Sequence, residues 1–231
     1  AMKKLIIKYS IEFFVIVFSI SVSFFVENLR EENEKDNQRI IVKQSLIQEL
    51  KSAEAYLRYR NRAFEEDLKA VELILNKDAT LDSVFSNVSS GGFSNPFIVS
   101  RNFNPPSSVY KSLINDGRIN LIKSQKLKSL IEDTYVYYTE FIHAWQDDDE
   151  KIASIIEMQI IENHTSFYMK DIFTGEDIGI MLEFYEMVQK DSKLKAYLKA
   201  KTVPMSVKMN TLEGYMESRK NLISALEESL D

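Results

Sequence analysis

The stretch Phe13–Val26, with the sequence FFVIVFSISVSFFV, determines how this chain is organised. It contains no charged residue, no proline and no glycine. With its flanks it supplies the run of about 20 mostly apolar residues that crosses a hydrocarbon core of about 30 Å, at a helical rise of about 1.5 Å per residue. We therefore predict a transmembrane anchor over residues 1–30 and a body that lives in water over residues 31–231.

The lysines of the chain indicate how this anchor is oriented. Lys3, Lys4 and Lys8 precede the apolar run, whereas mostly acidic residues follow it. By the positive-inside rule, we expect a cytoplasmic N-terminus and an extracytoplasmic body at the inner (plasma) membrane, which is periplasmic in a Gram-negative cell. The alternative is a cleaved signal peptide. Glu12 interrupts the apolar region of such a peptide, and Phe24-Phe25 is a poor cleavage junction.

One face of the anchor carries polar residues. At 100° per residue these positions fall within about 40° of one line: Lys8, Glu12, Ser19, Ser23 and Arg30. A carboxylate costs about 2.5–3.5 kcal/mol at the centre of a membrane helix, and membrane helices pack closely through small and hydroxyl residues. The stripe predicts contact with another membrane helix. The alternative is that Glu12 lies at the headgroups beside Lys8.

These residues also carry a resemblance to a known family. The segment KYSIEFFVIVFSISVSFFVENLREENEKD, residues 8–36, resembles the N-terminal part of the DUF6090-like family of single-pass bacterial membrane proteins. Glu12 stands at the family's glutamate and residues 27–32 at its polar exit, whereas Ile11 replaces a glycine and Leu29 a tryptophan. Residues 109–138 resemble the family's second segment, a glycine turn leading into a helix. The resemblance implies membrane placement and no established biochemical activity.

A long helix is expected to continue from the anchor through residues 5–76, because no proline or glycine occurs before Ser90. Its apolar positions recur with spacings of three and four, as in a heptad seam. The residues that form this coiled-coil seam are Leu46, Leu50, Leu57, Phe64, Leu68 and Leu75. The seam must be buried against the chain itself, a second copy or a partner.

The least regular part of the chain lies at residues 77–108, where glycine and proline are concentrated. Its large apolar side chains are unusual for a linker. We predict a loop folded onto the helices, with a short strand at Phe97–Val99. Phe93, Phe97 and Phe103 make it a candidate recognition loop, since loops on rigid scaffolds often carry function. The alternative is a packed cover for the end of the bundle.

The remaining sequence predicts further helices. Ser107 or Ser108 caps one helix and Ser124 caps the next, which runs to about Glu162. Later helices are expected at 177–190 and 192–201, with Pro204 opening the last. With only 6 glycines and 4 prolines, the expected fold is all-α. We predict a transmembrane helix that continues into a long helix and packs with an antiparallel extracytoplasmic helical bundle.

Composition and motifs exclude several function classes. A net charge of −6 argues against a nucleic-acid partner, and the absence of cysteine removes thiolate chemistry. Glu140 and His143 form a lone Glu-x-x-His pair, whereas a di-iron bundle requires two such pairs. The acidic run 147–150 lacks the pattern of a calcium loop and is expected to be solvated. We expect no cofactor, no metal site and no enzymatic activity.

These expectations favour a membrane-anchored accessory or scaffold subunit. Its partners would be membrane lipid and another integral membrane protein or a copy of itself, contacted through the anchor and the helical body. The alternative is an extracytoplasmic sensor, or ligand-binding module, that signals through a membrane partner.

Overall fold

A computed structural model describes residues 2–78, 96–170 and 178–230, with side chains placed from Glu12 onward except for Ile178. These residues are almost entirely helical, and no strand occurs among them. This confirms the all-α expectation for the described part of the chain. The short strand predicted at Phe97–Val99 is wrong, because the backbone forms a turn at residues 96–98 and the side chains of Phe97 and Ile98 enter the core, whereas Val99 is exposed.

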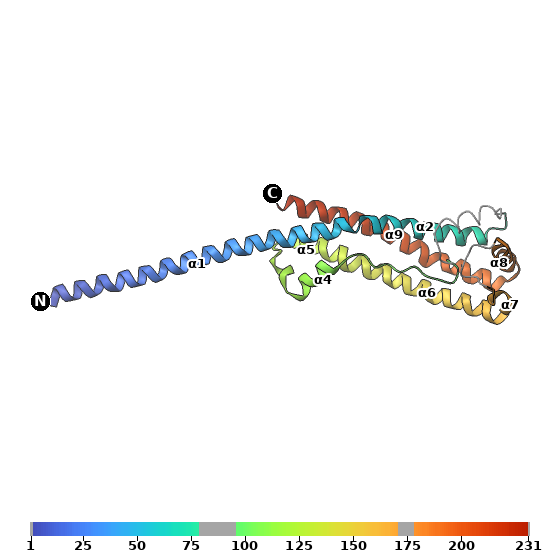
Figure 1. Cartoon of the computed structure of the whole chain (residues 1–231), viewed down its shortest axis with the longest axis horizontal. Coiled ribbons are helices and arrows are strands. Elements are labelled where there is room, and N and C mark those ends of the chain that lie inside the picture. The colour runs from blue at the N-terminus through green and yellow to red at the C-terminus, as the bar shows by residue number, and fades with distance from the viewer. Residues whose placement is uncertain (1, 79–95, 171–177, 231) are drawn as a thin grey trace.

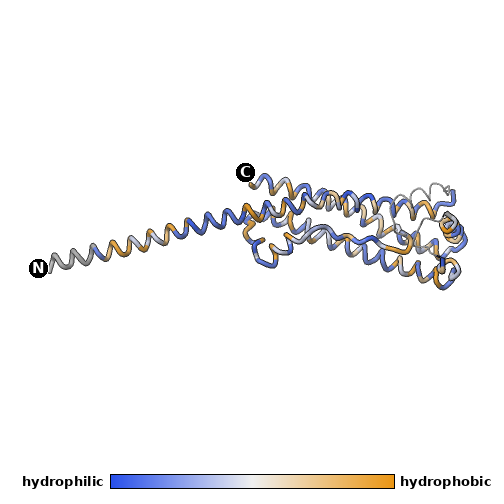
Figure 2. The backbone as a smooth tube through the Cα atoms, viewed as in Figure 1, coloured by the Kyte–Doolittle hydropathy of each residue, from blue (hydrophilic) through white to orange (hydrophobic). Residues whose placement is uncertain are grey.

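The first helix, α1 (Met2–Ser52), projects far beyond the rest of the molecule (Figure 1). Its apolar part is long and apolar enough to cross a membrane, and none of that stretch is buried. Figure 2 shows the change along α1 from the apolar segment to a hydrophilic one before the bundle begins. We refer to residues 27–41 as the stalk. Helical pairs such as Glu27–Arg30 and Glu31–Lys35 support the stalk as a solvated helix.

The single helix expected over residues 5–76 is interrupted once. After α1 ends at Ser52, Ala53 adopts a turn, and α2 (Glu54–Leu75) follows in nearly the same direction (Figure 1). Helix α4 (Ser108–Asn115) and the 3-10 helix η1 (Arg118–Leu121) then form a corner beside α1, with Gly117 at φ 68°. Glycine adopts this left-handed conformation at little cost.

A second long helical run follows that corner. It consists of α5 (Gln125–Glu132), the π-helical turn η2 (Asp133–Tyr137) and α6 (Tyr138–Asn163). Ser124 caps this run as predicted, accepting a hydrogen bond from the amide of Leu127. The short helix α7 (Thr165–Tyr168) and α8 (Ile178–Lys190) lie at the end of the bundle opposite the stalk (Figure 1).

The last helix, α9 (Ser192–Glu228), returns along the whole bundle, in the direction opposite to α2 and α6 (Figure 1). Pro204 lies inside α9, so the prediction that it opens a separate helix is wrong. Pro204 and Met205 are both buried. Their packing on the neighbouring helices offsets the free-energy cost of the backbone hydrogen bond that proline cannot form. Gly214 allows close approach, since a Cβ there would lie 2.8 Å from Cε1 of Tyr138.

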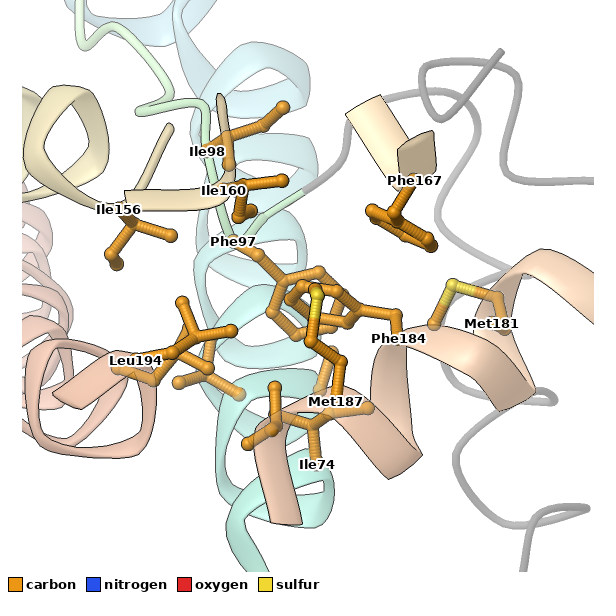
Figure 3. Packing of buried hydrophobic residues seen from close by; sticks show 14 of the residues in the cluster. Ile74, Phe97, Ile98, Ile156, Ile160, Phe167, Met181, Phe184, Met187 and Leu194 are labelled. Carbon is orange, nitrogen blue, oxygen red and sulfur yellow. The ribbon is translucent and has the colours of Figure 1, made fainter. Parts of the chain in front are cut away.

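Three buried apolar clusters follow one another along the bundle. The cluster nearest the stalk joins Leu46 and Leu50 of α1 to Leu222 and Leu226 of α9. The middle cluster includes Leu57, Phe64, Phe103, Leu212 and Tyr215. The cluster at the distal end gathers side chains from α2, α6, α8, α9 and the segment at Phe97 (Figure 3). In each cluster α9 covers the apolar face of α1 or α2.

Candidate functional site

The predicted membrane stripe lies on the exposed part of α1. The hydroxyl groups of Ser19 and Ser23 donate to the carbonyls of Val15 and Ser19, at 2.7 and 2.9 Å. Arg30 pairs with Glu27 at 2.9 Å, and the side chain of Lys8 lies outside the described residues. Because both hydroxyls are satisfied within the helix, a second helix could pack on this face without supplying polar partners.

The predicted seam packs against the chain's own last helix. Leu46, Leu50, Leu57, Phe64 and Leu68 are buried, whereas Leu75 is only partly buried. Ile74 is fully buried in its place. Leu57, Phe64 and Leu68 keep the predicted face after the turn at Ala53, so the departure is confined to the last turn of α2, where Ile74 enters the distal cluster and Leu75 packs at its edge. Of the three ways in which this seam could be covered, the structure uses the chain itself.

Two of the three aromatic residues that suggested the candidate recognition loop are buried. Phe97 is 1% exposed and Phe103 is fully buried, while Phe93 lies outside the described residues. The ring of Phe97 lies 4.7 Å from that of Phe184, and the ring of Phe103 lies 5.3 Å from that of Tyr215. These two phenylalanines belong to the core, as in the alternative reading of a packed cover. The physical reason is that the helices leave apolar gaps that this segment fills.

An extended segment, residues 97–106, begins in the turn at residues 96–98, runs along the bundle toward α4 (Figure 1) and is held by polar contacts. The amide of Phe103 donates to Oε1 of Gln146 at 2.9 Å, and the carbonyl of Phe103 bonds Nε2 of His143 at 2.7 Å. The amide of Asn104 donates to the hydroxyl of Tyr56 at 2.6 Å. His143 therefore has a structural role in which it fixes this segment on α6.

The same segment covers a buried network of charged side chains. Lys201 and Lys208 of α9 both donate to the carboxylate of Asp149, which also accepts from Ser100 at 2.7 Å. Asp149 is 1% exposed and Lys201 is fully buried. Burial opposes ionisation of Asp149, but the two ammonium groups outweigh it and lower the pKa of Asp149; burial also lowers the pKa of Lys201.

Asp149 corrects the expectation of a solvated face at residues 147–150. Asp147, Asp148 and Glu150 are exposed, whereas Asp149 points inward from the opposite side of α6. Helical geometry places one residue of any such run on the buried face. The signal in the sequence was the pair Lys201 and Lys208 on α9, two helical turns apart, among apolar residues.

A second ion pair lies beside this network. The guanidinium of Arg101 makes a two-pronged contact with the carboxylate of Asp67 on α2, with its Nη2 at 2.8 Å from Oδ1. Asp67 from one pair, and Asp149 and Lys208 from the other, border a small cavity of about 10 Å³, whose lining also includes Phe64. This volume holds about one water molecule, and the polar lining suits one. The network thus fixes the extended segment between α2, α6 and α9.

Glu49 forms a separate buried site where α1 meets the corner helices. Its carboxylate accepts from the amides of Val109 and Tyr110, at 2.6 and 3.1 Å, and from the hydroxyl of Tyr135 at 3.0 Å. The predicted cap by Ser107 or Ser108 is therefore wrong, since a side chain from α1 caps α4 instead. Burial and the nearby Glu49 carboxylate raise the pKa of Tyr135, so its hydroxyl remains a donor.

Arg219 of α9 contacts the break between α1 and α2. Its Nη1 donates to the carbonyl of Leu50 at 2.6 Å, and its Nη2 contacts the carboxylate of Glu54. Leu50 lies one turn before Glu54, so this guanidinium occupies the place where the helical ladder is interrupted. A side chain inserted into the ladder is a recognised cause of such a break.

At the distal end, Asp191 caps α9 and joins it to α6. It accepts from the amides of Lys193 and Leu194, from Gln159 at 3.0 Å and from Nε2 of His164 at 2.9 Å. Burial opposes ionisation, but these hydrogen bonds outweigh it and lower the pKa of Asp191 to about 2.

This cap predicts a specific loss of stability in acid. Because the folded-state pKa of about 2 lies below the ordinary value of 3.8, the stabilisation is present above about pH 4 and is lost as the pH falls toward 2. We expect the melting temperature of Asp191→Asn to change less over this range than that of the parent chain. Equal acid sensitivity of the two chains would contradict this assignment.

The described residues contain no group of three or more His, Asp or Glu side chains placed to hold a metal ion. Comparisons with protein-family models, with curated proteins and with solved structures gave no match to this chain.

Proposed function

We propose that this protein is a membrane-anchored accessory or scaffold subunit, which packs in a larger membrane complex or homo-oligomer through its N-terminal helix. The observation that carries the proposal is the contrast along α1. From Glu12 onward the side chains of its anchor are exposed, whereas its seam in the bundle is already covered by α9. Within the described part of α1, the apolar run is thus left without a covering helix, and it is the part that would lie in lipid.

The polar stripe supplies the packing surface in this proposal. Ser19 and Ser23 offer small side chains whose hydroxyls are satisfied internally, so another helix approaches closely there. Glu12 lies at the cytoplasmic end of the apolar run in the orientation given by the lysines. The stalk then holds the bundle on the extracytoplasmic side of the inner membrane. Membership of the DUF6090-like family is part of this proposal and rests on the residues around Glu12.

The sensor alternative requires a ligand-binding surface, and residues 77–108 were the candidate recognition loop. Phe97 and Phe103, two of its three candidate aromatic residues, lie in the core. The scaffold proposal does not depend on these side chains, and the ion-paired segment that carries them favours a rigid body.

The test compares assembly of the full chain with and without its membrane carboxylate. In mild detergent, light scattering coupled to size chromatography is expected to give a species larger than a monomer, and Glu12→Leu is expected to shift it to the monomer. Val17→Leu, on another face of α1, is the matched control and should leave the size unchanged. A monomeric parent chain that Glu12→Leu does not alter would exclude packing through the stripe.

The same preparation tests the anchor itself. We expect the membrane-extracted chain to have the intact mass that includes Phe13–Val26. A chain trimmed near Phe24, or one recovered without detergent, would identify a signal peptide and contradict the proposal.

A further inference from the structure

The corner beside the stalk is one of two basic stretches in the body of the chain, and the other, residues 190–208 around the start of α9, lies toward the distal end (Figure 1). Residues 107–131, which we call the basic lobe, contain α4, η1 and most of α5. They carry five basic side chains and one acidic one, a net charge of +4 in a chain whose total is −6. The basic residues are Lys111, Arg118, Lys123, Lys126 and Lys128. The rest of the chain therefore has a net charge of −10, and the exposed acidic residues Glu132 and Asp133 follow the lobe directly.

These charges are available to a partner. Lys111, Arg118, Lys123 and Lys126 are exposed, and Lys128 is half-buried. Arg118 pairs with Asp116 at 2.7 Å, whereas the four lysines form no ion pair within the described ranges. Ile114, at the tip of the lobe, is 46% exposed. The surface combines free ammonium groups with one exposed apolar side chain, which suits a layer of anionic headgroups over acyl chains.

The lobe is attached firmly to the helix that carries the anchor. Its inner face, including Leu113, Ile122 and Leu127, packs against Val42 and Leu46 of α1 in one buried cluster. Glu49 adds the cap of α4 described above. The lobe therefore moves with α1 as one body.

Its position along α1 places it at the end of the bundle that faces the bilayer, level with the C-terminal end of α9 (Figure 1). Val42, the first buried residue of α1, lies 16 residues beyond Val26, which corresponds to about 24 Å of helix. Membrane helices tilt by up to about 40°, and neighbouring helices lie about 8–10 Å apart. Because the lobe protrudes from one side of α1, a tilt toward α4 lowers it toward the headgroups.

From this geometry we propose that the basic lobe binds the anionic phospholipid surface of the membrane in which the chain is anchored, and thereby sets the direction in which α1 tilts. This inference rests on the proposed anchoring. Attraction between exposed charges is screened beyond about 8 Å at physiological salt, so the contact forms only in the tilted state. An acidic protein surface would fit the same charges, and the lipid-only experiment below distinguishes the two.

The test uses the full chain in lipid nanodiscs, either of phosphatidylcholine alone or of an equal mixture with phosphatidylglycerol. Because the chain has no cysteine, Asn115→Cys allows one fluorophore to be attached at the tip of the lobe. Spin labels on the lipid headgroups quench the fluorophore only when the lobe contacts the membrane. The ratio of quenched to unquenched fluorophore is expected to be about fivefold higher in the anionic discs, because one lysine near such a surface shifts the equilibrium toward contact by about that factor. High salt should abolish the difference. Ser192→Cys, at the distal end, should show none.

A charge variant completes the test. In the Asn115→Cys background, Lys111→Gln with Lys123→Gln and Lys126→Gln should remove the lipid dependence. The matched control changes three exposed distal lysines, Lys77, Lys190 and Lys199, and should retain it. Equal quenching in both kinds of disc would overturn the lipid contact and leave an acidic protein as the partner to seek. Failure of the chain to enter discs would overturn the anchoring and this inference together.

Discussion

Replacing Asp149 with asparagine is expected to lower the free energy of unfolding by about 3–5 kcal/mol, the largest effect of any single substitution considered for this chain. The change removes the carboxylate that the buried ammonium groups of Lys201 and Lys208 both contact. It leaves two charges inside the bundle without that partner. Denaturant unfolding of the full chain in detergent, followed by the fluorescence of Trp145 one turn away, measures the loss.

The neighbouring residue supplies the control. Asp148 pairs with Lys151 at 2.9 Å on the surface, where both side chains are more than half exposed. Asp148→Asn is expected to change stability by less than about 1 kcal/mol. A triple replacement, Asp149→Leu with Lys201→Met and Lys208→Met, should recover much of the loss because apolar groups can substitute for a buried ion network. Equal stability of Asp149→Asn and Asp148→Asn would show that the network contributes little.

Replacing Glu49 with alanine is expected to cost about 2–4 kcal/mol, through loss of the helix cap and of charge-assisted hydrogen bonds. The amides of Val109 and Tyr110 and the hydroxyl of Tyr135 lose their acceptor together. We expect hydrogen exchange to accelerate at α4 before the bundle as a whole unfolds. Faster exchange at α4 alone would show that the basic lobe detaches from α1 when the Glu49 cap is lost.

Two substitutions distinguish the cap from simple loss of packing. Tyr135→Phe removes one donor to Glu49 and should cost about 1 kcal/mol while α4 stays protected. Gln48→Ala changes an exposed neighbour on α1 and should leave both stability and exchange unaltered. If the amides of Val109 and Tyr110 kept their protection in Glu49→Ala, the cap would be supplied by another group.

Much of the helical framework could be predicted from contiguous residues. The apolar run that defines the anchor, the heptad positions from Leu46 to Leu68 and the serine cap at Ser124 all depend on neighbours within a few turns. Helical periodicity reports which face of one helix is apolar, and here α9 covers that face. The prediction at Leu75 failed because packing at the distal end buries Ile74 instead. The prediction at Pro204 failed because α9 continues through this proline, which is buried against neighbouring helices.

The buried charged groups around Asp149 and Glu49 could not be predicted from such local patterns. Asp149 meets Lys201 and Lys208 across 52 and 59 residues of sequence, and Glu49 caps a helix that begins 59 residues later. Each of these groups looks like an ordinary surface charge in its own segment. Phe97 and Phe103 were candidates for a recognition loop because they are large apolar residues in a stretch rich in polar and turn-forming residues, and the sequence left open whether they pack as a cover.

By itself, the sequence determined that the chain has a helix apolar enough to span a membrane and an all-helical body, since hydropathy and helical period are properties of adjacent residues. Only the tertiary structure decided which charges are buried, which segment closes the core and where positive charge gathers beside the stalk. Burial depends on the surfaces that distant helices bring together, and a carboxylate becomes part of a core only when its partners arrive from another helix.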